Sequence, residues 1–337
     1  MRAFLFAVLS LSLTTAFLSD SFSQEVMRVE GRRIFDPCGE ELVMRGVNEM
    51  FIWSRDDLAG DRTMPEIALT GANTVRIVWL TDARNANASP ENLDRAIQNA
   101  IDNKMFPMPE LHDATGRLDR VPALVEYWTR PDIVEVLKKH EEYLLLNIAN
   151  EAGDHNVKAD EFKRVYSDAI ARIRATGLRC PLVIDASGWG QDIGILHETG
   201  PWLLDQDPER NLIFSIHTWW VADDGSRDRI IDGLQRSVDM DLPLIVGEFA
   251  PMGVKCREWI DYKTLLAECQ RHGIGWLAWS WGQVRNGDCH LMDMTGGDAR
   301  GRFEGLHGWG KEVAVTDPNS IMNTSVRTWY LENGRCR

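Results

Sequence analysis

Two glutamates in this 337-residue chain each end a short apolar run. Residues 144–149 lead directly into Asn150 and Glu151, and the run that begins at Leu242 leads into Glu248. Because a buried carboxylate is costly to desolvate, two of them at the ends of apolar strands indicate chemistry. A pair of carboxyl groups can act as acid and nucleophile if their surroundings keep one protonated and the other charged.

Eight apolar runs recur along the chain and predict the scaffold for these groups. Their starts lie 30 to 38 residues apart, which is the length of one strand, one helix and two connections. The runs are continuous and do not alternate with polar residues, as expected for parallel strands covered on both faces. The pattern predicts a (β/α)8 TIM barrel; an open doubly wound sheet is the alternative, but no GxGxxG turn follows the first run. The runs are 42–47, 74–80, 106–111, 143–151, 181–185, 211–220, 242–250 and 274–281.

The segments around these runs carry their own signals. Ser89 and Pro90 are an N-cap and a first-turn proline, and they predict a helix over 92–104. Turn residues within 29–40 predict a short N-terminal β-hairpin that plugs the bottom of the barrel. The glycine-rich loop 282–318, after strand eight, is predicted to shape the top face, and a final helix is predicted around 320–332.

Polar residues gather where the predicted strands meet the loops that follow them, which is where barrel enzymes place their chemistry. Arg76 lies in the second strand, His112 and Asp113 follow the third, and His217 lies in the sixth. The two glutamates end strands four and seven, so they could approach to about 5 Å, the separation found in retaining glycoside hydrolysis. Arg76 and His217 are predicted to support the charged glutamate, and Asn150 to bind a sugar hydroxyl.

Thirteen tryptophans are many for this length, and aromatic faces are platforms for sugar rings. Four of them, in helical or loop context, are predicted to pack in the core: Trp128, Trp202, Trp259 and Trp329. The predicted substrate-binding residues are Trp53, Trp79, Asp113, Trp189, Gln191, Trp219, Trp220, Trp279 and Trp281.

The N-terminus predicts export. Arg2 precedes an apolar stretch over 3–17, and Ser21 to Ser23 fit a small-x-small cleavage site, so residues 1–23 are interpreted as a signal peptide. Residues 24–337 are then expected to form one catalytic domain of a secreted protein, extracellular or periplasmic. All six cysteines lie after residue 23, and disulfides are favoured over zinc, although six cysteines allow fifteen pairings.

The net charge of −14 disfavours nucleic acid and anionic membrane surfaces as partners, and a neutral or cationic partner fits better. No strand offers an HxH pair and no HExxH motif occurs, so neither a metal nor another cofactor is expected. The expected partner is a polysaccharide or an oligosaccharide. The oligomeric state is not predicted.

The chain resembles glycoside hydrolase family 5, of clan A, from its first predicted strand to its eighth. The resemblance implies a retaining endo-β-glycanase with Glu151 as acid/base and Glu248 as nucleophile. It also matches Arg76, His112, Asn150, His217 and Trp279 to the remaining family active-site positions. The motifs that carry it are MRGVNEMFIW (44–53), TGANTVRIV (70–78), ELHDATG (110–116), LNIANE (146–151), VIDASGWGQD (183–192), NLIFSIHTW (211–219), LIVGEF (244–249) and GWLAWSWG (275–282).

The sequences of three motifs most resemble those of the bacterial β-mannanase subgroup, but the chain departs from that subgroup at three positions. Glu49 begins a segment that is usually rich in histidine, Trp79 replaces a smaller residue, and Trp219 stands where a tyrosine is usual. These changes favour a β-1,4-linked glucan, cellulose-like or mixed-linkage, with endo-β-1,4-mannanase activity as the alternative. A non-catalytic carbohydrate-binding barrel is a minor alternative, since both glutamates are present.

Overall fold

The computed structural model describes residues 25–223 and 225–337, and within them the predicted barrel is present. Eight parallel strands close in the order β10-β3-β4-β5-β6-β7-β8-β9, and each overlaps one of the predicted apolar runs. Every residue of β4 and β5 is buried, as expected for strands covered on both faces. The barrel strands are β3 (Arg45–Glu49), β4 (Thr74–Trp79), β5 (Phe106–Leu111), β6 (Leu146–Asn147), β7 (Leu182–Asp185), β8 (Leu212–His217), β9 (Leu244–Glu248) and β10 (Gly275–Ala278).

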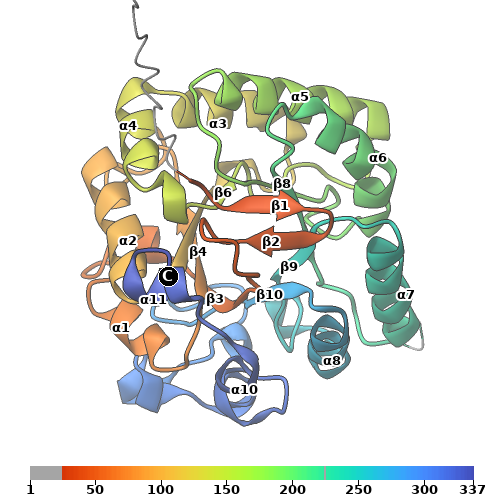
Figure 1. Cartoon of the computed structure of the whole chain (residues 1–337). Coiled ribbons are helices and arrows are strands. Elements are labelled where there is room, and N and C mark those ends of the chain that lie inside the picture. Colours follow the sequence, from red (N-terminus) through yellow and green to blue (C-terminus); the bar gives the residue numbers. More distant parts are fainter. Residues whose placement is uncertain (1–24, 224) are drawn as a thin grey trace, which may run out of the picture.

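Helices surround the barrel (Figure 1). The predicted helix over 92–104 is α2, and its first turn is built as expected: Pro90 begins the helix, and the Ser89 side chain accepts a hydrogen bond from the Asn92 amide. The helices are α1 (Thr63–Ala68), α2 (Pro90–Asp102), α3 (Val121–Trp128), α4 (Pro131–Lys139), α5 (Ala159–Arg174), α6 (Ile193–Gln206), α7 (Ser226–Asp239), α8 (Tyr262–His272), α9 (Gly308–Lys311), α10 (Ile321–Thr324) and α11 (Trp329–Asn333).

The predicted hairpin consists of β1 (Arg28–Glu30) and β2 (Arg33–Phe35), paired antiparallel. In Figure 1 it lies across the centre of the ring of helices. Ile34 and the preceding Met27 are buried in one apolar cluster with Phe106 and Ile213, which lie near the starts of their strands. The hairpin therefore closes the N-terminal end of the barrel, as predicted, and leaves the other end to the loops.

The prediction of one final helix over 320–332 is wrong. The structure has two short helices there, α10 and α11, joined by extended backbone. The Thr328 side chain accepts a hydrogen bond from the Leu331 amide, so it caps a new helix and does not continue the old one. Arg327 fixes the connection by donating to the backbone oxygens of Ala68 and Ala72.

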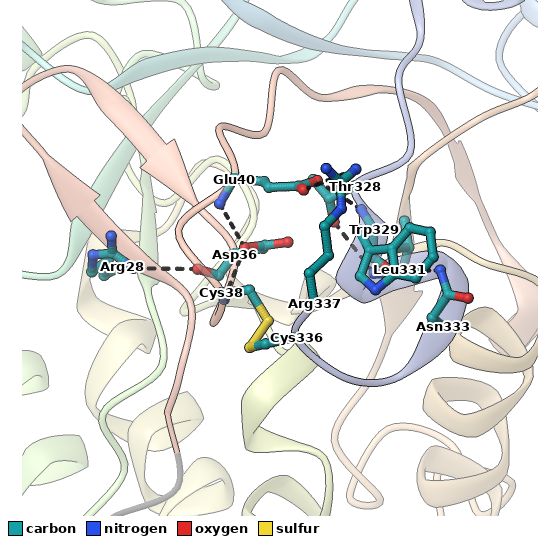
Figure 2. The surroundings of a disulfide bond; sticks show 10 residues. All are labelled: Arg28, Asp36, Cys38, Glu40, Thr328, Trp329, Leu331, Asn333, Cys336 and Arg337. Carbon is teal, nitrogen blue, oxygen red and sulfur yellow. Dashed lines mark hydrogen bonds and ion pairs between the residues drawn. A yellow bond between two sulfur atoms is a disulfide. The ribbon is translucent and has the colours of Figure 1, made fainter.

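Four of the six cysteines form disulfides. Cys38–Cys336 joins the segment after β2 to the chain beyond α11, across a sequence separation of 298 residues. Figure 2 shows Glu40 beside this bond, where its carboxylate accepts a hydrogen bond of 2.7 Å from the Trp329 amide. The second disulfide is Cys256–Cys289, and the remaining two cysteines, Cys180 and Cys269, are buried free thiols.

The predicted signal peptide, residues 1–23, lies outside the described residues. Within the described part of the chain, no helix combines the length and the apolar character needed to span a bilayer.

Candidate active site

A cavity of about 550 Å³ opens where the barrel strands meet their following loops. Both glutamates line it, together with His112. Five of the predicted substrate-binding residues also line it: Trp53, Trp189, Gln191, Trp219 and Trp279.

The two glutamates face each other inside the cavity. One carboxylate oxygen of Glu151, one of Glu248 and a ring nitrogen of His217 all lie within 4.8 Å of one another. Glu248 ends β9, whereas Glu151 follows β6 and takes a left-handed conformation with φ of 46°. The Glu151 amide donates to a carboxylate oxygen of Asp185 at 3.1 Å, which holds this uncommon backbone in place. The short separation matches retaining glycosidases, in which the two carboxyl groups are about 5–5.5 Å apart.

Arg76 is fully buried inside the barrel and organises this site. Its Nη1 donates to Glu248 Oε1 at 2.7 Å, and its Nη2 donates to Asn150 at 2.8 Å and to Asp185 at 3.1 Å. The same guanidinium also donates to Asn48 and Asn147. Every branch of the fork is therefore used, and one side of Glu248 is fixed by a charged hydrogen bond.

The surroundings of the two glutamates differ in how strongly they favour the protonated form. Burial raises the pKa of Glu248 to about 7, while Arg76 and His112 oppose that rise. Burial, together with Glu248 and Asp185, raises the pKa of Glu151 well above its usual range. Because Arg76 contacts Glu248 directly, Glu248 is the member of the pair that ionises first, and Glu151 is the member that holds the proton.

His217 lies closer to Glu151 than to Glu248, which corrects the prediction that it supports the charged glutamate. Its Nδ1 is 2.8 Å from Glu151 Oε1 and 3.5 Å from Glu248 Oε2. Burial and the nearby cations lower the pKa of His217 well below its usual range, so the ring is neutral. The Trp219 indole also donates to Glu151, at 3.2 Å.

Asn150 was predicted to bind a sugar hydroxyl, but it does not line the cavity. It is fully buried, its oxygen accepts from Arg76, and its nitrogen donates to Thr115 Oγ1 at 2.9 Å. His112 does line the cavity, and its Nδ1 lies 2.8 Å from a carboxylate oxygen of Glu110. Although burial opposes the charged form, Glu110 raises the pKa of His112 above its usual value.

Two tryptophans and His112 form an aromatic group at one side of the cavity. The Trp279 ring stacks on His112 with centroids 5.8 Å apart, and Trp53 meets His112 edge-on at 5.6 Å. Trp53 is 41% exposed, and Trp189, which also lines the cavity, is 40% exposed. Both therefore offer an open face to a sugar ring.

Three other predicted tryptophans do not contact the cavity, because they belong to the core. Trp79 is fully buried and donates to the Tyr127 hydroxyl on α3, so it faces the surrounding helices. Trp220 and Trp281 are buried as well, and each donates to a backbone oxygen. The opposite error occurs at three of the four tryptophans that were predicted to pack in the core. Trp128 is fully buried as predicted, but the others are exposed: Trp202 by 39%, Trp259 by 64% and Trp329 by 38%.

Asp113 also has a structural role that the sequence did not reveal. Its carboxylate accepts the Thr81 amide at 2.8 Å, which joins the ends of β4 and β5, and it lines a neighbouring cavity instead of the main one.

The loop after β10 lines the cavity, which confirms the prediction that this loop shapes the top face, but the sequence analysis did not name the loop residues that complete the cavity. Val254 comes from the loop after β9, and the Cys256–Cys289 disulfide joins that loop to the one after β10. Buried Glu49 joins β3 to the same β10 loop, because its carboxylate accepts the amides of Met50 and Gln283. The other missed lining residues are Met50, Thr115, Val284, Arg285, Asn286, Gly287, Asp288 and Met292.

Among the described residues, the groups close enough to share a metal ion are Glu151, His217 and Glu248. The Arg76 guanidinium already occupies one side of Glu248, at 2.7 Å. Its fixed positive charge opposes a cation at this position.

The family model described as "Cellulase (glycosyl hydrolase family 5)" matches residues 35–285. A mannan endo-1,4-beta-mannosidase of Salipaludibacillus agaradhaerens is 35% identical over 302 residues, which cover 88% of this chain and 93% of that protein. A second protein of that name, from Cellvibrio japonicus (strain Ueda107), is 31% identical and covers 88% of this chain and 67% of its own length.

Among solved structures, a beta-mannanase from Streptomyces thermolilacinus has a TM-score of 0.80 at 32% identity, covering 91% of this chain and 99% of that one. A structure of the beta-mannanase from that species with mannohexaose has the same TM-score at 31% identity. An endoglucanase from Thermobifida fusca has a TM-score of 0.65 at 16% identity and so shows a shared fold alone.

Proposed function

Since the chain belongs to glycosyl hydrolase family 5, we propose that it hydrolyses the β-1,4-linked backbone of a mannan with retention of configuration. The observation that carries this proposal is the carboxyl pair, whose nearest oxygens lie within 4.8 Å beneath a cleft with exposed indole faces. That spacing leaves no room for a water between the carboxylate and the sugar, so direct attack by the carboxylate is favoured over attack by water.

Mannan is preferred here to the β-glucan that the sequence analysis favoured. Three relatives that are 30–35% identical over at least 88% of this chain are named for mannan, and so are the structures with the higher TM-scores, whereas an endoglucanase that also covers the chain is only 20% identical. Of the three departures that favoured glucan, Trp79 is core and Glu49 links two loops through backbone amides, so neither contacts the cavity. Met50, in the segment that Glu49 begins, and Trp219 do line the cavity, but one thioether and one indole are a weak basis for choosing glucose over mannose.

The proposed mechanism assigns one step to each glutamate. Glu248, ionised beside Arg76, attacks the anomeric carbon, while Glu151 gives its proton to the departing sugar oxygen. This step forms a glycosyl ester on Glu248 and leaves Glu151 ionised. Glu151 then takes a proton from water, the water oxygen attacks the same carbon, and the ester breaks, which restores both groups.

The neighbours of Glu151 suit this change of charge. The Trp219 indole donates to its carboxylate at 3.2 Å, and neutral His217 lies 2.8 Å away without a fixed positive charge. A cation at that position would hold Glu151 ionised and remove its proton before the first step.

Two substitutions test the assignment. Glu248→Gln should abolish release of reducing sugar from mannan, because no nucleophile remains. Glu151→Gln should also fail on mannan, by about 10²–10⁴-fold, but should still form the ester with an aryl β-mannoside whose leaving group needs no proton. A burst of phenol from Glu151→Gln, absent from Glu248→Gln, is the expected result; a burst from Glu248→Gln instead would reverse the roles.

Substrate choice is measured on wild-type protein with galactomannan, glucomannan, mixed-linkage β-glucan and soluble cellulose. Cleavage of both mannans with a kcat/KM at least tenfold above that for the glucans is expected. A higher kcat/KM for the glucans would return the assignment to endo-β-glucanase. No cleavage of any of the four would favour a non-catalytic carbohydrate-binding barrel.

We also infer that the protein acts outside the cytoplasm. Two disulfides in the described chain support this, because such bonds persist in oxidising compartments. Fractionation of the producing cells, with the N-terminus of the exported protein sequenced, checks both this location and the cleavage after Ser23.

A further inference from the structure

A second cavity of about 420 Å³ adjoins the main cleft and shares two of its lining residues, His112 and Thr115. Thr115 Oγ1 accepts a hydrogen bond of 2.9 Å from Asn150, the residue before Glu151. The second cavity therefore branches from the cleft beside the proposed catalytic pair. Its lining residues are Arg84, His112, Asp113, Thr115, Arg117 and Arg120; we call it the arginine pocket.

Two loops build the arginine pocket, the connection from β4 to α2 and the connection from β5 to α3. Arg84 lies in the connection between β4 and α2, and His112 and Asp113 lie directly after β5. Arg120 ends the short 3₁₀ helix Leu118–Arg120 that precedes α3, and Arg117 comes directly before that helix. The pocket is thus formed on the same top face as the cleft, by loops that the barrel strands position.

Positive charge dominates this pocket. The carboxylate in its lining, Asp113, is occupied by the Thr81 amide and hydroxyl, and Arg84 approaches it only to 3.7 Å. Arg117 pairs with exposed Asp119 at 2.9 Å. Arg120 makes no side-chain hydrogen bond or ion pair to any described residue.

The concentration of arginine is unexpected in a protein with a net charge of −14. Such a protein repels anionic polymers at long range, so it has no general reason to gather cations beside its cleft. Guanidinium groups present paired N–H donors that match the two oxygens of a carboxylate. Neutral sugar hydroxyls make no comparable use of clustered guanidinium groups, even where two of them already have a carboxylate nearby.

We propose that the arginine pocket binds the carboxylate of an acidic sugar unit, a uronic acid, carried by the glycan whose backbone lies in the cleft. The inference rests on the proposed function, since it places a polysaccharide at Glu151 and Glu248. The volume suits a single branching sugar, because pockets of a few hundred Å³ hold ligands of that size. The enzyme then selects acidic, branched regions of its substrate over neutral ones.

Chemically substituted backbones supply a test with matched bulk. Carboxymethyl mannan and hydroxyethyl mannan, at equal degrees of substitution, differ mainly in the charge of the substituent. The same pair exists for cellulose, so the comparison works on whichever backbone the enzyme cleaves. We expect kcat/KM to be about fivefold higher on the carboxymethyl polymer at low salt, and the ratio to fall towards one in 0.5 M NaCl.

The variant Arg84→Gln/Arg117→Gln/Arg120→Gln should bring the ratio of the two kcat/KM values to about one. Exposed arginines on α5, on α7 and near the C-terminus supply a control with the same change in net charge: Arg164→Gln/Arg227→Gln/Arg335→Gln. The control should keep the wild-type ratio, which separates a local pocket from a general effect of charge.

Binding is measured separately, so that failure of the two proposals can be told apart. Affinity electrophoresis of Glu248→Gln in gels that contain each polymer should show stronger retardation by the carboxymethyl form, and the three pocket substitutions should remove the difference. The arginine pocket is overturned if the wild-type kcat/KM values on the carboxymethyl and hydroxyethyl polymers are about the same. It is also overturned if the triple arginine variant of the pocket keeps the wild-type preference for the carboxymethyl polymer. If the wild-type protein cleaves none of the polymers but Glu248→Gln is still retarded more strongly by the carboxymethyl form, the proposed hydrolase activity is overturned and the arginine pocket stands.

Discussion

Replacing Arg76 by lysine tests whether this guanidinium keeps Glu248 ionised. Arg76 makes five side-chain hydrogen bonds inside the barrel, two of them to carboxylates. A lysine ammonium has similar reach but no planar fork, so it cannot satisfy Glu248 and Asp185 together with three asparagines. At least one charged hydrogen bond is then broken in a fully buried site.

The magnitude follows from that broken bond. A hydrogen bond to a charged group contributes about 1.5–3 kcal/mol, and one pKa unit corresponds to about 1.4 kcal/mol. If the hydrogen bond to Glu248 is the one that breaks, the pKa of Glu248 should rise by about 1–2 units above the value of about 7 set mainly by burial. Because Glu248 must be ionised to attack, the acidic limb of the kcat/KM profile should move upwards by that amount.

The assay is the pH profile of kcat/KM on a mannooligosaccharide, and Arg174→Lys is the control. Arg174 also makes five hydrogen bonds from a buried site, two of them to the carboxylate of Asp207, but it lies at the end of α5, near the start of β8. Both variants should lose about 1.5–3 kcal/mol of unfolding free energy, because lysine keeps the charge but breaks at least one charged hydrogen bond in a buried site. Only Arg76→Lys should shift the acidic limb; an unshifted limb in that variant, with its measured destabilisation, would refute the reasoning.

Three further predictions test other parts of the site. In wild-type protein the acidic limb of the pH profile of kcat/KM should lie well above the ordinary glutamate pKa of 4.5, because burial raises the pKa of Glu248. The alkaline limb should report Glu151, whose pKa is raised further. An acidic limb at pH 4.5 would contradict this assignment. Cys256→Ser/Cys289→Ser should raise KM severalfold with little change in kcat, because the disulfide holds two loops of the cleft and contacts neither proposed catalytic glutamate. Steady-state kinetics that show a lower kcat at an unchanged KM would assign the disulfide another role. Trp79→Ala should lower the unfolding free energy by about 3–5 kcal/mol in chemical denaturation, because it leaves a large cavity in the core. A variant with wild-type stability and a raised KM would show instead that Trp79 binds substrate.

Much of the scaffold could be predicted because it depends on local signals. Continuous apolar runs at regular spacing specify strands and helices that alternate, and barrel closure follows from their number. The same reasoning placed Glu248 at a strand end, since the run that precedes it is buried whatever its neighbours are. Glu151 was placed in the same way, although the strand itself ends at Asn147 and the chain then turns through the left-handed region.

The direction of the side chains was harder to predict, yet part of it was available. Successive residues of a strand face opposite sides of the sheet, so Arg76 and Trp79, three positions apart in β4, cannot both point into the barrel. Arg76 is buried among the proposed catalytic groups, which places Trp79 against α3. Applying this rule to the tryptophans would have removed Trp79 from the predicted substrate-binding set.

The loops could not be predicted from local signals. Arg285 and its neighbours reach the cleft because the loop after β10 is joined to the loop after β9 by Cys256–Cys289 and to β3 by Glu49. Both links depend on residues distant in the sequence, and the sequence alone left fifteen disulfide pairings open. The prediction of one final helix failed for a related reason. Arg327, in the break between α10 and α11, is held by backbone oxygens from a segment more than 250 residues earlier.

The Cys38–Cys336 bond makes the chain between these two residues a covalent ring. One proteolytic cut anywhere in that ring leaves a single molecule, because the two new fragments remain tethered through the disulfide at the closed end of the barrel. The top-face loops, which must stay open to a polymer, are also the segments that a protease reaches most easily. The ring therefore allows the enzyme to survive a nick beside its own cleft, and on a gel such nicked protein should separate into two pieces only after reduction.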